Sequence, residues 1–276
     1  MVIANPIYDV VFKRMMENER VAKFFIGTLL EETIETVEVK TQEFTYTDEL
    51  AGLAVFRLDF IATIKSENGS YKKVLIEIQK AKNQIDLMRF RRYLAEQYKK
   101  EDIINGKSSI LPITTIYILG FQLPDIDSPC IKVERTYRDL VNQKTFDRKC
   151  DFIEKLSHDS FVVQVDRITD KYQTNLDKLL SVFEQRNFID TTKITKQFIH
   201  ETDIEEVEII ANILHHTGTD PEERKKIEIE QEAWRTVNAM FEAEKAELLA
   251  VIDEKDKALN EMARQLEELK DKLGKK

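Results

Sequence analysis

Residues 57–80 read RLDFIATIKSENGSYKKVLIEIQK, and this stretch decides the fold because a turn joins two strand-like runs within it. In each run, one set of alternate positions is wholly apolar and the other set carries polar side chains, as a strand with one face in the core requires. Burying both apolar faces together needs Phe60 opposite Ile76, because a slip of one residue would expose one of the two sets. The pattern therefore predicts an antiparallel hairpin with a fixed register.

This register has two consequences for the hairpin. It is centred on Asn68, so the loop has an odd number of residues, most simply 67–69 with Gly69 at positive φ. It also places Asp59 directly opposite Glu77, with Gln79 on the same face. Two carboxylates are then predicted to be neighbours on adjacent strands.

Facing carboxylates repel each other, and two explanations account for such a pair. A divalent cation, Mg²⁺ or Mn²⁺, would be held by Asp59 and Glu77, since these ions prefer carboxylate oxygens and complete their coordination with water and phosphate. Alternatively, one carboxylate forms an ordinary salt bridge with Arg57, Lys73 or Arg89. The spacing of the residues is compatible with both.

The other elements indicate a mixed α/β fold, with a central sheet flanked by helices. The dipeptide Asn5-Pro6 predicts a helix start, with Asn as the cap and Pro at the first helical position, followed by two short helices. A helix over 84–100 connects the third strand to the fourth, as a parallel crossover requires. The predicted strands are 37–46, 55–64, 73–79 and 114–121, with a further candidate at 160–165.

The composition indicates a soluble protein. The chain has 276 residues, 42% of them hydrophobic, with only 7 Gly and 5 Pro. No apolar run approaches the roughly 20 residues that cross a bilayer, and the first residues lack the apolar centre of a signal peptide. We therefore expect a cytoplasmic protein with no membrane partner, in which Cys130 and Cys150 are free thiols.

The charge is unevenly distributed along the chain. The net charge is −9, and residues 201–276 carry all of it, with 21 acidic and 12 basic side chains. Residues 51–100 have 11 basic and 5 acidic side chains, a local excess that would attract phosphates, although a solvated helix face gives the same count. In this region Arg89 and Tyr93 are spaced i, i+4, with Arg92 beside them; they either grip a nucleotide or close the helix over the sheet.

The segment 221–276 differs from the rest of the chain. It contains no Gly or Pro between Pro221 and Gly274, and its later apolar residues recur with the 3-4 spacing of a coiled coil. Such a polar helix is marginal by itself, so we expect residues 234–273 to pair with a second copy in a homodimer; the alternative is a helix docked on its own core. The predicted domains are a core at 1–170, a helical extension at 171–220, and a coiled-coil helix at 221–276.

Five blocks of sequence, taken in order over residues 3–125, resemble the PD-(D/E)xK nuclease superfamily, and within it the transposase-like branch of recombination-promoting nucleases. The blocks are NPIYDVVFKRMM, RLDF, IEIQ, DLMRFRRY and TTIYILGF. The resemblance implies a restriction-endonuclease-like core. It also implies residue roles: metal ligands Asp59 and Glu77, Gln79 in the place of the superfamily's lysine, Asp9 as the helix-borne acidic residue, and substrate contacts by Arg89 and Tyr93, with Arg92 close by.

The function implied by this resemblance is a Mg²⁺- or Mn²⁺-dependent DNA endonuclease linked to recombination or mobile elements. Gln79 departs from the superfamily's lysine, because an amide has no useful basicity and only positions water by hydrogen bonds. Lys80 follows in sequence but points to the opposite face of a strand. The metal would then activate the attacking water. The competing class is a catalytically inactive, nuclease-like DNA-binding or scaffold protein assembled through its coiled coil.

Overall fold

The structure, a computed structural model, describes residues 1–48, 53–80, 84–169 and 171–273. Within these ranges the side chains of residues 41–48, 53–59, 84–86, 89, 237, 238, 241, 244, 245 and 267–273 lie outside the description. None of the helices in the described ranges combines the length and the apolar character that crossing a membrane requires.

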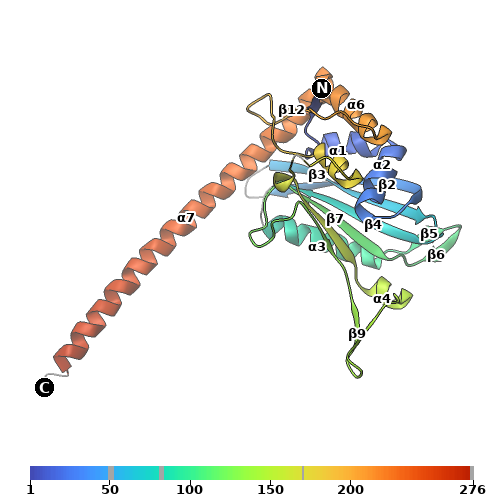
Figure 1. Ribbon diagram of the computed structural model, residues 1–276. Coiled ribbons are helices and arrows are strands. Elements are labelled where there is room, and N and C mark those ends of the chain that lie inside the picture. Colours follow the sequence, from blue (N-terminus) through green and yellow to red (C-terminus); the bar gives the residue numbers. More distant parts are fainter. Residues whose placement is uncertain (49–52, 81–83, 170, 274–276) are drawn as a thin grey trace. The chain divides into compact units, whose positions relative to one another are not determined.

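The centre of the fold is a six-stranded mixed sheet in the order β2-β3-β4-β7-β11-β8 (Figure 1). The first three strands are antiparallel neighbours, whereas β4, β7 and β11 run parallel to one another and β8 is antiparallel to β11. The predicted mixed α/β architecture is therefore confirmed. The strands are β2 (Ile34–Asp48), β3 (Leu53–Ser66), β4 (Tyr71–Gln79), β7 (Ile113–Leu119), β8 (Cys130–Val133) and β11 (Asp159–Gln164).

The hairpin of β3 and β4 has the register that the sequence predicts. Phe60 is the Cα partner of Ile76, and the ladder continues through Lys65 and Tyr71. The loop is 67–69, closed by a hydrogen bond from the Ser66 backbone N–H to the Ser70 carbonyl oxygen (2.9 Å), and Gly69 has a φ of 82°. The glycine is required here because only it adopts this left-handed conformation without strain.

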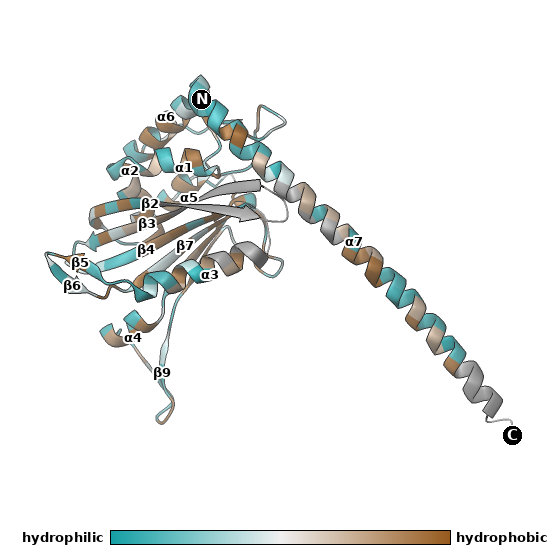
Figure 2. Cartoon of the chain, turned by 180° about the vertical axis from the view of Figure 1, so that it is seen from behind, coloured by the Kyte–Doolittle hydropathy of each residue, from teal (hydrophilic) through white to brown (hydrophobic). Residues whose placement is uncertain are grey.

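Helices cover both faces of the sheet. Apolar side chains of α1 (Asp9–Met16), α2 (Glu19–Leu30), α5 (Asn175–Ser181) and α6 (Glu205–Thr219) bury one face, where the rings of Phe12 and Phe60 pack edge to face at 4.9 Å. On the other face α3 (Gln84–Lys99) packs Phe90 and Tyr93 against Leu75. Figure 2 shows the apolar strands between the two helix layers.

The α3 crossover links β4 to its parallel neighbour β7, as predicted. A short hairpin of β5 (Asp102–Ile104) and β6 (Lys107–Ser109) follows the helix. A second hairpin, of β9 (Tyr137–Asp139) and β10 (Lys144–Phe146), follows β8 and leads through α4 (Asp151–Leu156) into β11. After β11 comes a short 3-10 helix, Val165–Arg167.

The predicted helix start at Asn5-Pro6 is wrong. The first helix begins at Asp9, after Tyr8 in extended conformation. The Asn5 side-chain amide donates instead to the side chain of Gln185 (3.0 Å) and the carbonyl oxygen of Lys193 (3.1 Å). The Asn5 Oδ1 atom does accept a local hydrogen bond from the Ile7 backbone N–H (3.3 Å), but in a turn that precedes the helix, and long-range bonds hold the amide group.

The first strand, β1 (Val2–Ala4), pairs antiparallel with β12 (Thr195–Gln197), so distant parts of the chain close the helix layer. Helix α6 lies against β1 at Gly218, where an added Cβ would be 2.9 Å from the Ala4 backbone nitrogen. Since any side chain there would clash, this position requires glycine. Residues 171–220 thus pack into the same unit as the sheet.

The chain divides into two compact units, Met1–Gln231 and Glu232–Lys276. Helix α7 (Pro221–Leu273) begins where the sequence changes character, with the Asp220 carboxylate accepting hydrogen bonds from the Glu222 and Glu223 backbone N–H groups, both 2.9 Å. The division falls inside the predicted 221–276 segment, because the first turns of α7 belong to the first unit, where Ile227 is fully buried.

The second unit is the remainder of α7. In its later turns the described apolar side chains of the predicted seam are more than half exposed, namely Leu248, Ile252, Leu259, Met262 and Leu266, whereas Trp234 near its start is 5% exposed. Pairing of this helix with a second copy stays a prediction.

Candidate functional site

Glu77 and Gln79 lie on the α3 side of β4, in the middle of the sheet. Both are buried, with exposed fractions of 2% and 9%. Leu75, two residues earlier, packs with α3, whereas Ile76 and Ile78 belong to the apolar core on the opposite face. The predicted alternation along this strand is therefore confirmed, and it brings both polar side chains to one face.

The β3–β4 ladder ends next to the predicted carboxylate pair. Its last pair is Phe60 with Ile76, and no Cα pairing of Asp59 with Glu77 follows it. On its other side Asp59 is the Cα partner of Gln42 on β2. The side chain of Asp59 lies outside the described residues, so its position opposite Glu77 stays a prediction.

Tyr117 is the neighbour of Glu77 on the parallel strand β7, and the sequence interpretation missed it. Burial raises the pKa of Tyr117 to about 12; a hydrogen bond with Thr115 opposes the rise, and the charge of Glu77 adds to it. The phenol is therefore uncharged at neutral pH and adds no second negative charge beside Glu77. The signal was present in TTIYILGF, where Thr115 and Tyr117 alternate with Ile116 and Ile118.

One of the three basic residues offered as a salt-bridge partner for the carboxylates has another partner. Lys73 is 3% exposed, and its Nζ lies 2.9 Å from the Asp102 carboxylate at the start of β5. The side chains of the other two candidates, Arg57 and Arg89, lie outside the described residues. The salt-bridge alternative therefore rests on these two arginines.

Lys80 lies on the other face of β4, as the strand geometry predicts. Its Nζ is 4.3 Å from the ring centroid of Tyr8 and forms an ion pair with Glu230. The same Glu230 carboxylate accepts a hydrogen bond from the Asp9 backbone N–H (2.9 Å) at the start of α1. Lys80 is thus held among residues of the α1 side and does not take the place of a base beside Gln79.

Asp9 belongs to this helix layer as well. It is 6% exposed and is the first residue of α1, which packs on the sheet face opposite to Glu77. The structure therefore brings Asp9 near Lys80, at the carboxyl end of β4. It does not place Asp9 on the face that carries Glu77 and Gln79.

The predicted substrate residues on α3 divide between core and surface. Tyr93 is 5% exposed and packs with Phe90 and Leu75, so it helps to close the helix over the sheet. Arg92 and its neighbour Arg91 are exposed. The side chain of Arg89 lies outside the described residues. Arg92 is therefore accessible to a ligand at the surface, whereas the ring of Tyr93 is largely buried.

Metal binding by the predicted pair depends on Asp59. Among the described side chains, which do not include Asp59, no three His, Cys, Asp or Glu residues are grouped closely enough to hold a metal ion. The oxygen-rich pair Asp59 and Glu77 stays a prediction. No family model, no curated protein and no solved structure matches this chain.

Proposed function

We propose that the protein is a metal-dependent DNA endonuclease of the PD-(D/E)xK type, which hydrolyses phosphodiester bonds. The observation that supports the proposal is the strand register: Phe60 pairs with Ile76, and Glu77 and Gln79 are buried on one face. We propose that this register continues by one residue, which would set Asp59 opposite Glu77. Two carboxylates in such positions favour a divalent cation, because their mutual repulsion would otherwise destabilise the hairpin.

Each side chain has a proposed role. Asp59 and Glu77 bind Mg²⁺ or Mn²⁺, which when bound lowers the pKa of water and screens the charge of the phosphate. The Gln79 amide orients the attacking water by hydrogen bonds, because it has no basicity to remove a proton. Lys80 does not supply the missing base, since it is paired with Glu230 on the other face. Asp9 has an accessory role from the α1 side.

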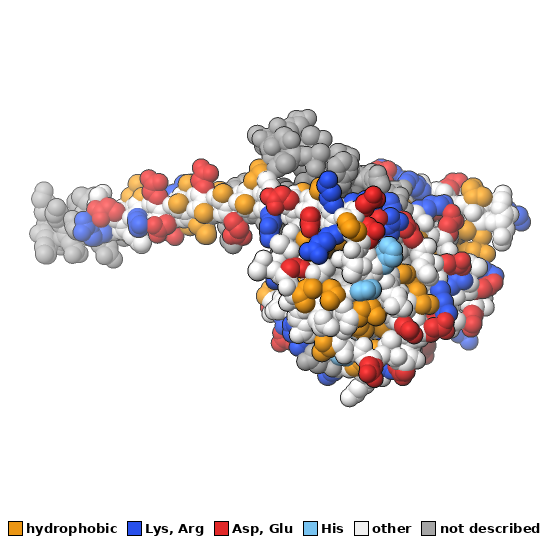
Figure 3. Space-filling model, turned by 90° about the horizontal axis from the view of Figure 1, so that it is seen from above, with side chains coloured by type: hydrophobic (Ala, Val, Ile, Leu, Met, Phe, Trp, Pro, Cys, Tyr) orange, Lys and Arg blue, Asp and Glu red, His pale blue; other side chains and the backbone are white. Residues whose placement is uncertain are grey.

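The α3 side of the molecule is the proposed surface for DNA. Arg91 and Arg92 are exposed there. Arg89 is proposed as a further phosphate contact, and Tyr93 as the residue that fixes α3 over the site. The face formed by α6 and β1 offers less to a polyanion: it mixes acidic and basic side chains (Figure 3), and Arg14 and Arg20 are engaged with glutamates at 2.6 Å.

We further propose a cytoplasmic homodimer that pairs through residues 234–273 and brings two cores to one DNA. The exposed apolar side chains of the second unit support this arrangement. They equally favour a second candidate, an inactive nuclease-like DNA-binding or scaffold protein in which the coiled coil is the functional part. Gln79 supports this alternative, because it stands where the superfamily has a lysine and an amide cannot act as a base.

A plasmid-nicking assay tests the proposal. The full-length protein is expected to nick supercoiled plasmid in Mg²⁺ or Mn²⁺ and not in EDTA. Asp59→Ala and Glu77→Ala should abolish nicking while the proteins stay folded; Glu96→Ala, an exposed change on α3, is the control and should be neutral. Nicking by a pure Asp59→Ala protein would refute the site. Metal-independent DNA binding without any nicking would favour the scaffold alternative.

A further inference from the structure

The hairpin of β9 and β10 has an apolar tip. Leu140 and Val141 occupy its turn and are 77% and 89% exposed, and Phe146 on β10 is 57% exposed. In both Figure 1 and Figure 2 the hairpin extends away from the sheet on the side that α3 covers. Turns of this kind usually carry Gly, Asn, Asp or Ser, so two large apolar side chains at the tip need an explanation.

The polar groups of the turn form hydrogen bonds with one another, while the apolar side chains stay exposed. The Asp139 carboxylate accepts hydrogen bonds from the backbone N–H groups of Val141 (2.8 Å) and Asn142 (3.1 Å), and from the Asn142 amide (2.7 Å). Gln143, with φ of 55°, donates through its side chain to the Leu140 carbonyl oxygen (2.7 Å). The turn conformation is thus fixed by local hydrogen bonds that leave the apolar side chains facing solvent.

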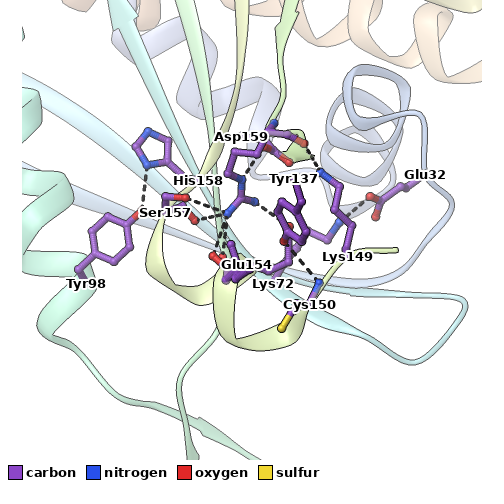
Figure 4. Close-up of polar contacts among 12 residues, drawn as sticks. Glu32, Lys72, Tyr98, Tyr137, Lys149, Cys150, Glu154, Ser157, His158 and Asp159 are labelled. Atoms are coloured by element: carbon purple, nitrogen blue, oxygen red, sulfur yellow. Dashed lines mark hydrogen bonds and ion pairs between the residues drawn. The ribbon is translucent and has the colours of Figure 1, made fainter. Parts of the chain in front are cut away.

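The base of the hairpin is anchored to the body of the protein by polar contacts; Figure 4 shows those around Tyr137, Glu154 and Asp159. The Arg135 guanidinium donates to the carboxylates of Asp159 (2.8 Å) and Glu154 (2.7 Å) and to the Ser157 carbonyl oxygen (2.8 Å). Tyr137 also donates to Glu154, and Lys149 Nζ donates to the Arg135 carbonyl oxygen (2.7 Å). These contacts tie both ends of the hairpin to α4 and β11, so its orientation is set before a ligand arrives.

Positive charge flanks the apolar tip. Residues 136–149 include two acidic side chains, Asp139 and Asp147, and the first of these is used by the turn. No acidic residue in the described part of the chain lies within ion-pair distance of Lys144 or Arg148, and both are exposed. The basic residues of this segment are Arg138, Lys144, Arg148 and Lys149.

We propose that this hairpin docks on double-stranded DNA, with Leu140 and Val141 entering the minor groove as a wedge against the base pairs, and with Lys144 and Arg148 contacting phosphates on either side. The inference rests on the proposal that the chain acts on DNA, and names how the substrate is gripped. Apolar wedges inserted from the minor groove unstack base steps, and flanking cations supply the affinity.

A lipid surface is a poorer match for the same features. Even a single myristoyl chain gives only marginal membrane binding, and Leu140 with Val141 presents fewer methylene and methyl groups than that chain. Cations that contact phosphates along a groove add affinity with each contact, so the limited apolar area is sufficient when the partner is DNA.

The test measures binding and unstacking without cleavage. Full-length protein in EDTA is titrated into a short duplex that contains one 2-aminopurine, whose fluorescence rises when the base unstacks. Leu140→Ser/Val141→Ser should abolish the rise and weaken binding by about tenfold. Ile103→Ser, which changes a 69% exposed side chain on the β5–β6 hairpin, is the matched control and should behave as wild type.

The cations are tested by salt dependence. Lys144→Gln/Arg148→Gln should reduce the slope of log K against log salt by about 2, because each lost phosphate contact removes about 0.9. Unchanged DNA binding and fluorescence in the Leu140→Ser/Val141→Ser protein would overturn the inference. It would also be overturned if this variant kept its DNA binding but lost binding to phosphatidylserine vesicles or lost self-association. If the protein binds DNA through the hairpin but does not nick it in Mg²⁺, the proposed nuclease activity is refuted and the proposed DNA contact by the hairpin is still supported.

Discussion

Lys80 and Glu230, 150 residues apart, form an ion pair beside the ring of Tyr8. The Glu230 carboxylate also accepts hydrogen bonds from the backbone N–H groups of Asp9 (2.9 Å) and Val10 (3.2 Å), so it caps the amino terminus of α1. The first turns of α7 are therefore a structural part of the sheet unit. The later turns form a unit of their own.

Two truncations separate these roles. A protein that ends after Gln231 keeps Ile227 and Glu230 and should fold, although it loses buried Trp234, whereas one that ends after Asp220 loses fully buried Ile227 and the Glu230 cap as well. We expect the shorter protein to lose more than about 3 kcal/mol, or not to fold, because a buried Ile and a buried ionic partner are both removed. Urea unfolding of the two proteins measures this. Equal stabilities would show that residues 221–231 contribute nothing to the core.

Replacements of Gln79 test whether it positions water. Gln79→Ala should lower the nicking rate, but by less than about 100-fold, because positioning is lost while the metal ligands remain. Gln79→Lys should raise the rate, and make it increase more steeply with pH as the buried amine loses its proton. Rates in Mg²⁺ across pH 6 to about 9 decide the matter. A Gln79→Ala protein as inactive as Glu77→Ala would give Gln79 a larger role than positioning.

Lys196 makes the free energy of unfolding depend on pH above neutrality. It is 1% exposed and donates to the carbonyl oxygen of Glu184; burial lowers its pKa to about 7, with the charge of Glu184 opposing and that of Arg186 adding to the shift. Between pH 7 and 10.5 the unfolded lysine binds a proton that the folded one does not, so this residue makes stability rise with pH there.

Lys196→Met removes this dependence. The substitution should raise the melting temperature most at or below pH 7, and the gain should shrink towards pH 10.5, where neither state pays for a buried charge. Thermal unfolding of both proteins at several pH values checks the trend. A difference in melting temperature that stays constant with pH would contradict it.

Pairing of the second unit is tested on its exposed apolar seam. Leu259→Asp/Leu266→Asp should convert a dimer to a monomer, since each buried leucine contributes about 1.5 to 3 kcal/mol before ordering costs. Lys257→Gln, which changes the exposed partner of Asp253, should leave the dimer intact. Light scattering at micromolar to millimolar protein gives the mass. Wild-type protein that stays monomeric over this range would refute the homodimer.

The β3–β4 hairpin could be read from the sequence because its information is local. Phe60 and Ile76 are close in the chain, their faces are cleanly apolar, and Gly69 supplies the turn, so one register satisfies every constraint. The face that carries Glu77 and Gln79 followed from the same alternation. Metal binding by Asp59 and Glu77 does not follow from this alternation, because it depends on where the Asp59 side chain lies.

Other features depend on distant partners or lack a burial signal. Asn5 looks like a helix cap, but it bonds to Gln185 and Lys193, which no local pattern reveals. The sequence gives no strand signal for the β9–β10 hairpin, because its apolar residues, such as Leu140, face solvent and follow no buried alternation. The role of Glu230 was hidden since a glutamate on a charged helix gives no sign that it is needed by α1.

The pairing of β1 with β12 sets an order of events during synthesis. Residues 2–4 leave the ribosome well before their partners at 195–197, which emerge roughly 10 to 40 s later at ordinary elongation rates. Until then Ile3 has no strand to pair with, and Phe12 on α1 awaits the rest of its core. The nascent chain therefore presents the apolar segment around Ile3 and Phe12 to chaperones until residues 195–197 emerge, and a ribosome that stalls before that point leaves the segment exposed.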